Sequence, residues 1–165
     1  MSSEPVTVYL GLGSNVGDRA ENLRTALTFL NQRLRIEKVS SMYDTAPREN
    51  IDQPRFLNQV CQAKTSLGPN ELLTLVQSIE NKLGRVPLSH NKPRPMDIDI
   101  LLYGNKIVDT PELTIPHPRM TERAFVLVPL AEIAPDVIHP KAKKTIKKLL
   151  QALKRNQDVV KYAGS

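Results

Sequence analysis

Hydrophobic and polar positions change their spacing along the chain in a way that predicts alternating strands and helices. Apolar residues recur three and four positions apart over residues 19–33 and 69–83, as in helices that bury one face. Asp18 precedes the first helix as an N-cap, and Gly84 ends the second. Runs of apolar and β-branched residues typical of strands occupy residues 6–12, 35–43, 56–66 and 96–103.

The order of these elements, β-α-β-β-α-β, predicts the α+β class with a ferredoxin-like core. We expect an antiparallel sheet with the two helices packed on one face. The dipeptide Gly104-Asn105 indicates a hairpin that leads into a short strand at residues 106–108. Two C-terminal helices are expected after this strand, at about residues 119–132 and 143–155.

The chain is expected to form one domain over residues 1–165, with its core at about residues 5–140 and the basic helix at about residues 143–155 closing it. Two long polar segments, residues 44–55 and 85–95, interrupt the predicted elements. Long loops in a small domain are often lids or binding elements. We therefore look for functional residues in these segments and beside them.

Composition is that of an ordinary globular protein, with 40% hydrophobic and 24% charged residues. No apolar run approaches the ~20 residues needed to cross a bilayer. The N-terminus lacks the basic and apolar regions of a secretory signal. The single cysteine, Cys61, cannot form an internal disulfide, which suits a reducing compartment. We therefore expect a cytoplasmic protein in which Cys61 is buried and inert.

The net charge of +6 suits an anionic partner such as a nucleotide, a nucleic acid or a membrane surface. Basic residues gather near the C-terminus, where a solvated helix face is favoured over a nucleic-acid site. Aromatic residues make up only 4% of the chain and tryptophan is absent. A surface that binds single-stranded nucleic acid by stacking would need more of them.

The pair Asp97 and Asp99 is the strongest candidate for chemistry. In a strand, both side chains project from one face, and Ile98 and Ile100 project from the other. Two close carboxylates repel each other unless a cation lies between them, and Mg²⁺ is the natural cation for such oxygen ligands. A solvated strand face explains the pair equally well. Nearby arginines favour the metal site, because Arg85 and Arg94 offer guanidinium groups that match phosphate oxygens.

Weaker signals surround this pair. The sequence Gly-Leu-Gly-Ser-Asn at residues 11–15 follows a predicted strand, where a tight strand-to-loop turn is favoured over a phosphate-binding loop. His117 stands between two prolines, and a surface histidine is favoured over a ligand contact. Gln77 and Glu80 lie on one face of a predicted helix, and helix solubilisation is the simpler interpretation. As a lone arginine on a predicted helix, Arg123 is expected to face solvent.

Taken together, these residues resemble the 6-hydroxymethyl-7,8-dihydropterin pyrophosphokinase family of folate biosynthesis, from about residue 6 to residue 140. The motifs that carry the resemblance occur in order along the chain. They are Gly-x-Gly-Ser-Asn at 11–15, Ser-Met-Tyr-Asp-Thr-Ala-Pro at 41–47, Asp-Gln-Pro-Arg-Phe-Leu-Asn at 52–58, Ile-Glu at 79–80, Gly-Arg at 84–85, Pro-Arg-x-x-Asp-Ile-Asp-Ile at 93–100, Pro-His-Pro-Arg-Met at 116–120 and Arg-Ala-Phe at 123–125.

The resemblance implies an ATP-dependent diphosphotransferase that converts the pterin to its diphosphate and releases AMP. By matching motifs, Asp97 and Asp99 are expected to hold two Mg²⁺ ions, and Arg85 and Arg94 to clamp the phosphates. The residues implied on the ATP side are Gln77, Glu80, Ile100, Leu113, Thr114, His117 and Arg123. The residues implied around the pterin are Thr45, Ala46, Pro47, Phe56, Asn58 and Phe125, with the two phenylalanine rings stacked on the heterocycle.

Two other functions remain open on the same scaffold. One is a nucleic-acid-binding module, although carboxylates on the fourth strand would repel phosphates. The other is a metal-dependent phosphohydrolase that uses Asp97 and Asp99 to activate water. We expect ATP and the pterin as partners, with no nucleic acid, no membrane and no obligate protein partner. We also expect no second enzyme of folate synthesis fused to this chain.

Overall fold

The computed structural model describes residues 4–47, 52–84, 95–153 and 158–163. Its elements follow in the order β1 (Val6–Ser14), α1 (Arg19–Asn31), β2 (Arg35–Val39), β3 (Tyr43–Thr45), β4 (Phe56–Thr65), α2 (Pro69–Lys82), β5 (Asp97–Tyr103), β6 (Val108–Asp109), β7 (Thr114–Ile115), the 3₁₀ turn η2 (Met120–Glu122), α3 (Ala124–Ile133), α4 (Ile146–Gln151) and β8 (Val159–Lys161).

The main sheet has the strand order β5-β1-β4-β3-β8, and β2 pairs with β4 as well. All of these pairings are antiparallel. The strand β5 lies beside β1, and β1 lies beside β4, which is the arrangement of a ferredoxin-like βαββαβ core. The predicted α+β class and its antiparallel sheet are therefore confirmed.

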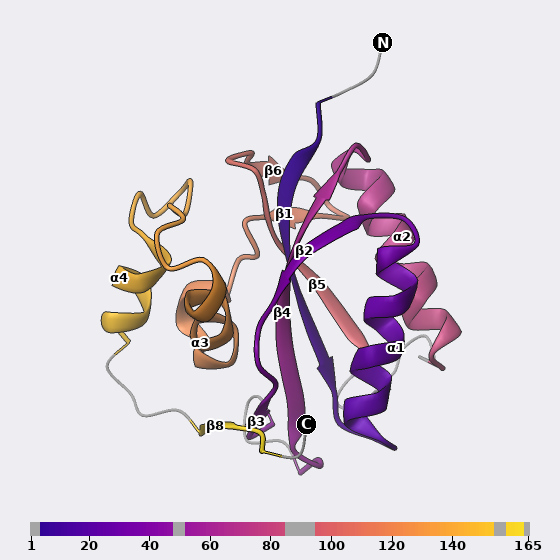
Figure 1. The fold of residues 1–165 in the computed structure, drawn as a ribbon. Coiled ribbons are helices and arrows are strands. Elements are labelled where there is room, and N and C mark those ends of the chain that lie inside the picture. The colour runs from indigo at the N-terminus through magenta and orange to yellow at the C-terminus, as the bar shows by residue number, and fades with distance from the viewer. Residues whose placement is uncertain (1–3, 48–51, 85–94, 154–157, 164–165) are drawn as a thin grey trace.

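Helices cover both faces of this sheet (Figure 1). On one face, α1 and α2 bury Leu23, Leu30 and Ile79 against β1 side chains such as Leu10. On the other face, α3 and α4 enclose a second core with Tyr9. The expectation that the first two helices share one face is confirmed, and the C-terminal helices pack on the opposite face.

Local signals place the ends of the first two helices correctly. The side chain of Asp18 accepts a hydrogen bond of 3.1 Å from the backbone N–H of Glu21, so the predicted N-cap of α1 is confirmed. Pro69 opens α2, whose Glu71 carboxylate accepts from the backbone N–H of Gly68 at 2.8 Å. Gly84 follows α2 with a φ of 97°, a conformation that glycine adopts without strain.

The strand predicted over residues 35–43 is wrong as a single element. The structure divides it into β2 and β3, which pair with different parts of β4. Between them Ser40 is buried, and its hydroxyl accepts from the backbone N–H of Val60 at 3.0 Å. The amide of Gln59 donates to the Ser40 carbonyl at 2.8 Å. Side-chain hydrogen bonds thus replace the backbone hydrogen bonds of the sheet at the point where the strand breaks.

The hairpin predicted at Gly104-Asn105 is also wrong. The segment that follows does not return along β5, and β6 pairs instead with β7 in a separate two-stranded sheet. Leu113 and Ile115 are buried in the core between the sheet and helices α1 and α2. This burial brings β7 into the position where it pairs with β6. The backbone N–H of Gly104 bonds to the Thr7 carbonyl at 2.8 Å, which directs the chain away from β5.

The C-terminal region differs most from expectation. The helix predicted at 119–132 begins as the 3₁₀ turn η2 before α3. The helix predicted at 143–155 is reduced to α4, because Lys143 takes a φ of 60° and Thr145 caps the helix by accepting from Lys148. Residues 154 and 155 lie outside the described residues. The strand β8 was not predicted, and it adds to the sheet beside β3 (Figure 1).

Two expectations about the whole chain meet the structure directly. Cys61 is fully buried in β4, so its expected burial is confirmed, and this burial raises the pKa of its thiol to about 12. Among the residues that the structure describes, no helix combines the length and the apolar character needed to cross a membrane.

Candidate active site

A cavity of about 470 Å³, including its part open to solvent, lies on the face of the sheet that α3 covers. Five structural elements line it. They are β1 with Gly11, Leu12 and Gly13, β3 and its end with Thr45 and Ala46, β4 with Phe56, Asn58, Gln59 and Val60, β5 with Asp97, Asp99 and Leu101, and α3 with Phe125 and Val126. Apolar walls with a few polar side chains are typical of sites for small organic ligands.

Two glycines form the floor of this cavity. Gly11 and Gly13 both lie inside β1, where Gly13 pairs with Asn58 of β4 on one side and with Asp97 of β5 on the other. A Cβ atom at Gly13 would lie 2.8 Å from Oδ1 of Asn58, so any side chain there would displace the amide. The predicted strand-to-loop turn at residues 11–15 is therefore wrong for Gly11 and Gly13. Glycine inside a strand marks a close approach, and this signal could have identified the floor.

The carboxylates of Asp97 and Asp99 both face the cavity, as the alternation along β5 predicts. Ile98 and Ile100 point the other way, into the core beneath α1 and α2. Asp99 keeps 35% of its side chain exposed. The pair is thus accessible at one edge of an otherwise apolar cavity, which distinguishes it from a strand face that merely contacts bulk water.

His117 approaches the same carboxylates. Its Nε2 lies 4.0 Å from Oδ1 of Asp99. Its backbone N–H donates to the carbonyl of Leu101 at 3.1 Å, and its Nδ1 accepts from the backbone N–H of Arg119 at 3.3 Å. Because Nδ1 accepts, Nε2 carries the proton of the neutral ring and faces Asp99. The loop between Pro116 and Pro118 therefore holds a directed hydrogen-bond donor, Nε2 of His117, beside the acidic pair.

Glu80 makes a contact that the sequence did not indicate. Its carboxylate is buried in α2, with 6% of the residue exposed, and accepts the backbone N–H of Ile98 at 2.7 Å. Ile98 is the residue between the two aspartates, so this bond fixes the backbone that carries them. The expectation that Glu80 is a solubilising residue is wrong. Gln77, one turn earlier on α2, is exposed.

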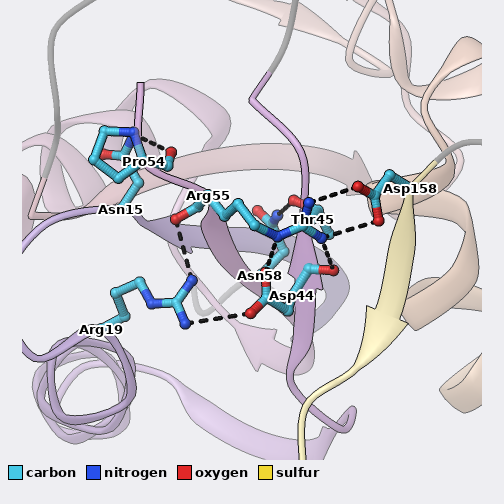
Figure 2. Close-up of polar contacts among 8 residues, drawn as sticks. All are labelled: Asn15, Arg19, Asp44, Thr45, Pro54, Arg55, Asn58 and Asp158. Carbon is cyan, nitrogen blue, oxygen red and sulfur yellow. Dashed lines mark hydrogen bonds and ion pairs between the residues drawn. The ribbon is translucent and has the colours of Figure 1, made fainter. Parts of the chain in front are cut away.

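The residues expected around the pterin come together almost completely. Thr45, Ala46, Phe56, Asn58 and Phe125 all line the cavity. Asn58 donates from Nδ2 to Oγ1 of Thr45 at 2.6 Å in a buried setting, which orients both polar groups (Figure 2). Pro47 is half-buried and is not among the residues that line the cavity.

The residues expected around ATP are more scattered. The side chain of Ile100 is buried in the core behind the sheet, so only its backbone could reach a nucleotide. Leu113 is buried and Thr114 half-buried, next to each other at the start of β7. The guanidinium of Arg123 packs 5.5 Å from the ring centroid of Phe125, so it contacts the cavity wall instead of projecting only into solvent. Arg85 and Arg94 lie outside the described residues.

A second group of residues joins α3 to β3 and was missed from the sequence. The carboxylate of Glu132 accepts from Oη of Tyr43 at 2.7 Å and from Oγ and N–H of Ser41 at 2.9 and 3.1 Å. Burial raises the pKa of Glu132, but these hydrogen bonds outweigh it and hold the pKa below its ordinary value. Because α3 carries Phe125 and β3 carries Thr45, this contact joins two walls of the cavity.

This contact predicts a pH dependence of stability. Burial, then the hydrogen bond to Glu132, raises the pKa of Tyr43 from 10.0 to about 12. Stabilisation by the neutral phenol is therefore complete below pH 10 and is lost as pH rises to about 12. We expect Tyr43→Phe to lower the free energy of unfolding at pH 7 by about 1 kcal/mol and to flatten its decline above pH 10. Urea unfolding at several pH values measures this, and parallel curves for both proteins would contradict it.

Comparison with known proteins agrees with this geometry. Residues 9–135 match the family described as 7,8-dihydro-6-hydroxymethylpterin-pyrophosphokinase (HPPK). The chain is 50% identical over 131 residues to 2-amino-4-hydroxy-6-hydroxymethyldihydropteridine pyrophosphokinase of Bacillus subtilis, covering 78% of each protein. It is 46% identical to the protein of the same name from Aquifex aeolicus, covering 86% of this chain and 88% of that one.

Longer proteins match as well. The chain is 44% identical to the folic acid synthesis protein FOL1 of Dictyostelium discoideum, over 81% of its own length but only 20% of that protein. Among solved structures, the HPPK-DHPS of Plasmodium falciparum aligns with a TM-score of 0.75 at 18% identity, over 90% of this chain and 45% of that one. At this identity the structural match concerns the fold alone.

Proposed function

Because the chain belongs to the 7,8-dihydro-6-hydroxymethylpterin-pyrophosphokinase family, we propose that it transfers the diphosphate group of ATP to 6-hydroxymethyl-7,8-dihydropterin and releases AMP. One observation carries the proposal. A single cavity combines two accessible carboxylates, Asp97 and Asp99, with an aromatic and amide-lined slot for a flat heterocycle. A nucleic-acid-binding module would gain nothing from two carboxylates beside this slot, because they would repel phosphates.

The acidic pair fits Mg²⁺. Within the described ranges no group of three or more His, Cys, Asp or Glu side chains is arranged to hold a metal ion. Mg²⁺ commonly takes only one or two carboxylates and completes its shell with water and phosphate oxygens. We place two Mg²⁺ ions at Asp97 and Asp99, where they would neutralise the ATP phosphates and lower the pKa of the attacking hydroxyl.

The pterin is proposed to lie on the glycine floor between Phe56 and Phe125, where both rings can stack on it. Asn58 and Thr45 offer polar groups at one edge of the slot. A heterocycle without matching hydrogen-bonding groups would leave these buried groups unpaired, which gives the site its specificity. The backbone around Ala46 completes this edge.

ATP is proposed to approach from the side of β5 and β7. His117 can donate from Nε2 to a phosphate oxygen beside Asp99, and Glu80 holds the strand that presents the acidic pair. The residues proposed on this side are Gln77, Glu80, Ile100, Leu113, Thr114, His117 and Arg123. Arg85 and Arg94, outside the described residues, are proposed to clamp the phosphates.

The reaction then depends on positioning and electrostatics. The pterin hydroxymethyl oxygen attacks the β-phosphorus in line with the bridging oxygen to the α-phosphorus. The hydroxyl gives up its proton to solvent as a P–O bond forms to the pterin, the bond from the β-phosphorus to that bridging oxygen breaks, and AMP departs with the electron pair. Arg85 and Arg94 would stabilise the charge that develops, and the apolar walls of the cavity exclude water that would hydrolyse ATP.

Release of AMP tests this function directly. The protein is incubated with Mg-ATP, with and without 6-hydroxymethyl-7,8-dihydropterin, and nucleotides and pterins are separated by chromatography. We expect AMP and pterin diphosphate in equal amounts, and only when the pterin is present. Phosphate or AMP formed equally without pterin would instead identify a phosphohydrolase, and no product in either case would contradict the proposal.

A further inference from the structure

The wall of the cavity that carries Thr45 depends on a segment from the far end of the chain. The strand β3 has only three residues and lies between β4 and β8, with Thr45 opposite Phe56 on one side and Val159 on the other. The backbone N–H of Ala46 also donates to the Asp158 carbonyl at 3.2 Å. Without β8, this short strand would be an edge with unpaired backbone groups.

Charged side chains reinforce this pairing at its end. The guanidinium of Arg55 lies between two carboxylates (Figure 2). It donates to both oxygens of Asp158, at 2.5 and 3.0 Å. It also donates to Oδ1 of Asp44 at 2.6 Å and to the Asp44 carbonyl at 3.2 Å. Arg55 thus makes four hydrogen bonds in a fork geometry that a lysine could not reproduce.

Arg19 extends the group from α1. It donates to Oδ2 of Asp44 at 3.4 Å and to the carbonyl of Arg55 at 3.1 Å. The cluster therefore contains two arginines and two aspartates, and its formal charges balance. Hydrogen bonding from Arg55, against a smaller opposing effect of burial, lowers the pKa of Asp158. Isolated exposed ion pairs stabilise little, but bidentate pairs joined in a network are the exception.

The cluster lies directly behind the cavity wall. Asp44 precedes Thr45 and Arg55 precedes Phe56, and neighbouring residues in a strand point to opposite faces. A shift of Asp44 or Arg55 on one face therefore moves Thr45 or Phe56 on the other. Asp158, immediately before β8, restrains such shifts because it holds Arg55 directly and Asp44 through Arg55.

We propose that Asp158 and Arg55 are positioning residues for the pterin, through which β8 holds Thr45 and Phe56 in place. This inference rests on the proposed function. Neither residue lines the cavity, so each acts on the substrate through its neighbours. The acidic pair on β5 lies at the other edge of the sheet, so the effect should be confined to the pterin.

The test compares KM values for the two substrates in the full chain. We expect Asp158→Asn and Arg55→Gln each to raise KM for the pterin about tenfold and to change KM for ATP less than about twofold. The double variant should resemble Arg55→Gln alone, because Arg55→Gln already removes the bonds to Asp158. Asp158→Glu, which keeps the carboxylate, should restore most of the pterin affinity.

Asp136→Asn is the matched control, since Asp136 is an exposed carboxylate in the loop after α3. It should leave both KM values unchanged. Equal increases in KM for pterin and ATP, or a fall in melting temperature with unchanged KM for the pterin, would overturn the positioning role. Wild-type protein without pterin-dependent AMP release would instead contradict the proposed function, so the two failures are distinguishable.

Discussion

Asp97→Asn and Asp99→Asn should each lower turnover by about three orders of magnitude while changing the pterin dissociation constant less than about threefold. Each substitution preserves shape and removes one negative charge. An amide oxygen is a poor replacement for a carboxylate at a Mg²⁺ site. The proposed pterin contacts come from β1, β3, β4 and α3, so affinity for the pterin should persist. Loss of chemistry without loss of pterin binding is the expected pattern.

Single-turnover formation of AMP measures the chemical step, and fluorescence titration of the pterin measures binding. The same reactions at increasing Mg²⁺ should show that the variants need more metal than the wild type for half-maximal rate. Asp136→Asn again serves as the control, because it removes an exposed carboxylate away from the cavity. Turnover within about tenfold of wild type in either variant would reject the assignment of Asp97 and Asp99 to the metal.

Local sequence patterns were sufficient to predict that the two aspartates share one face of their strand. Strand alternation requires only the residues of β5 themselves, so the sequence predicts that Asp97 and Asp99 share a face, and the structure confirms it. The N-cap at Asp18 and the start of α2 at Pro69 are equally local. The βαββαβ order follows from such elements, and the antiparallel sheet follows from the order.

Long-range contacts could not be predicted in the same way. Arg55 and Asp158 are 103 positions apart, and nothing near Val159–Lys161 indicates the strand that pairs with β3. The break between β2 and β3 depends on hydrogen bonds of Ser40 to residues of β4. Such contacts exist only once distant segments have been brought together, and no spacing within one segment encodes them.

Glu80 shows the same limit within the site. Its position on α2 is typical of a solvated helix face, yet the carboxylate is buried against the backbone of Ile98. Only the packing of α2 against the edge strand β5 gives the carboxylate this partner. The resemblance of motifs marks Glu80 as part of the site, while its contact with β5 emerges only from the fold.

Gly13→Ala should raise KM for the pterin about tenfold or more, because its methyl group would fall where Asn58 now lies. A Cβ at this position would be 2.8 Å from Oδ1 of Asn58 and 3.5 Å from Cδ1 of Phe56. The first distance is too short for any stable contact, so the Asn58 amide must rotate or the strands must separate. Rotation of the amide would break its bond to Thr45, and separation of β1 from β4 would move Asn58 away from the floor, so either change disturbs the polar edge of the slot.

Gly11→Ala provides the matched control on the same face of β1. Its Cβ would meet Leu101 at 3.5 Å, an ordinary van der Waals distance, and would leave Asn58 in place. We expect a smaller increase in KM for the pterin from Gly11→Ala than from Gly13→Ala. The two variants should have similar melting temperatures if rotation of the Asn58 amide alone relieves the clash at Gly13. Equal effects of the two substitutions would indicate that both methyl groups simply fill the cavity. Binding of the pterin would then be limited by the volume above the glycine floor, and the orientation of Asn58 would have no separate part in recognition.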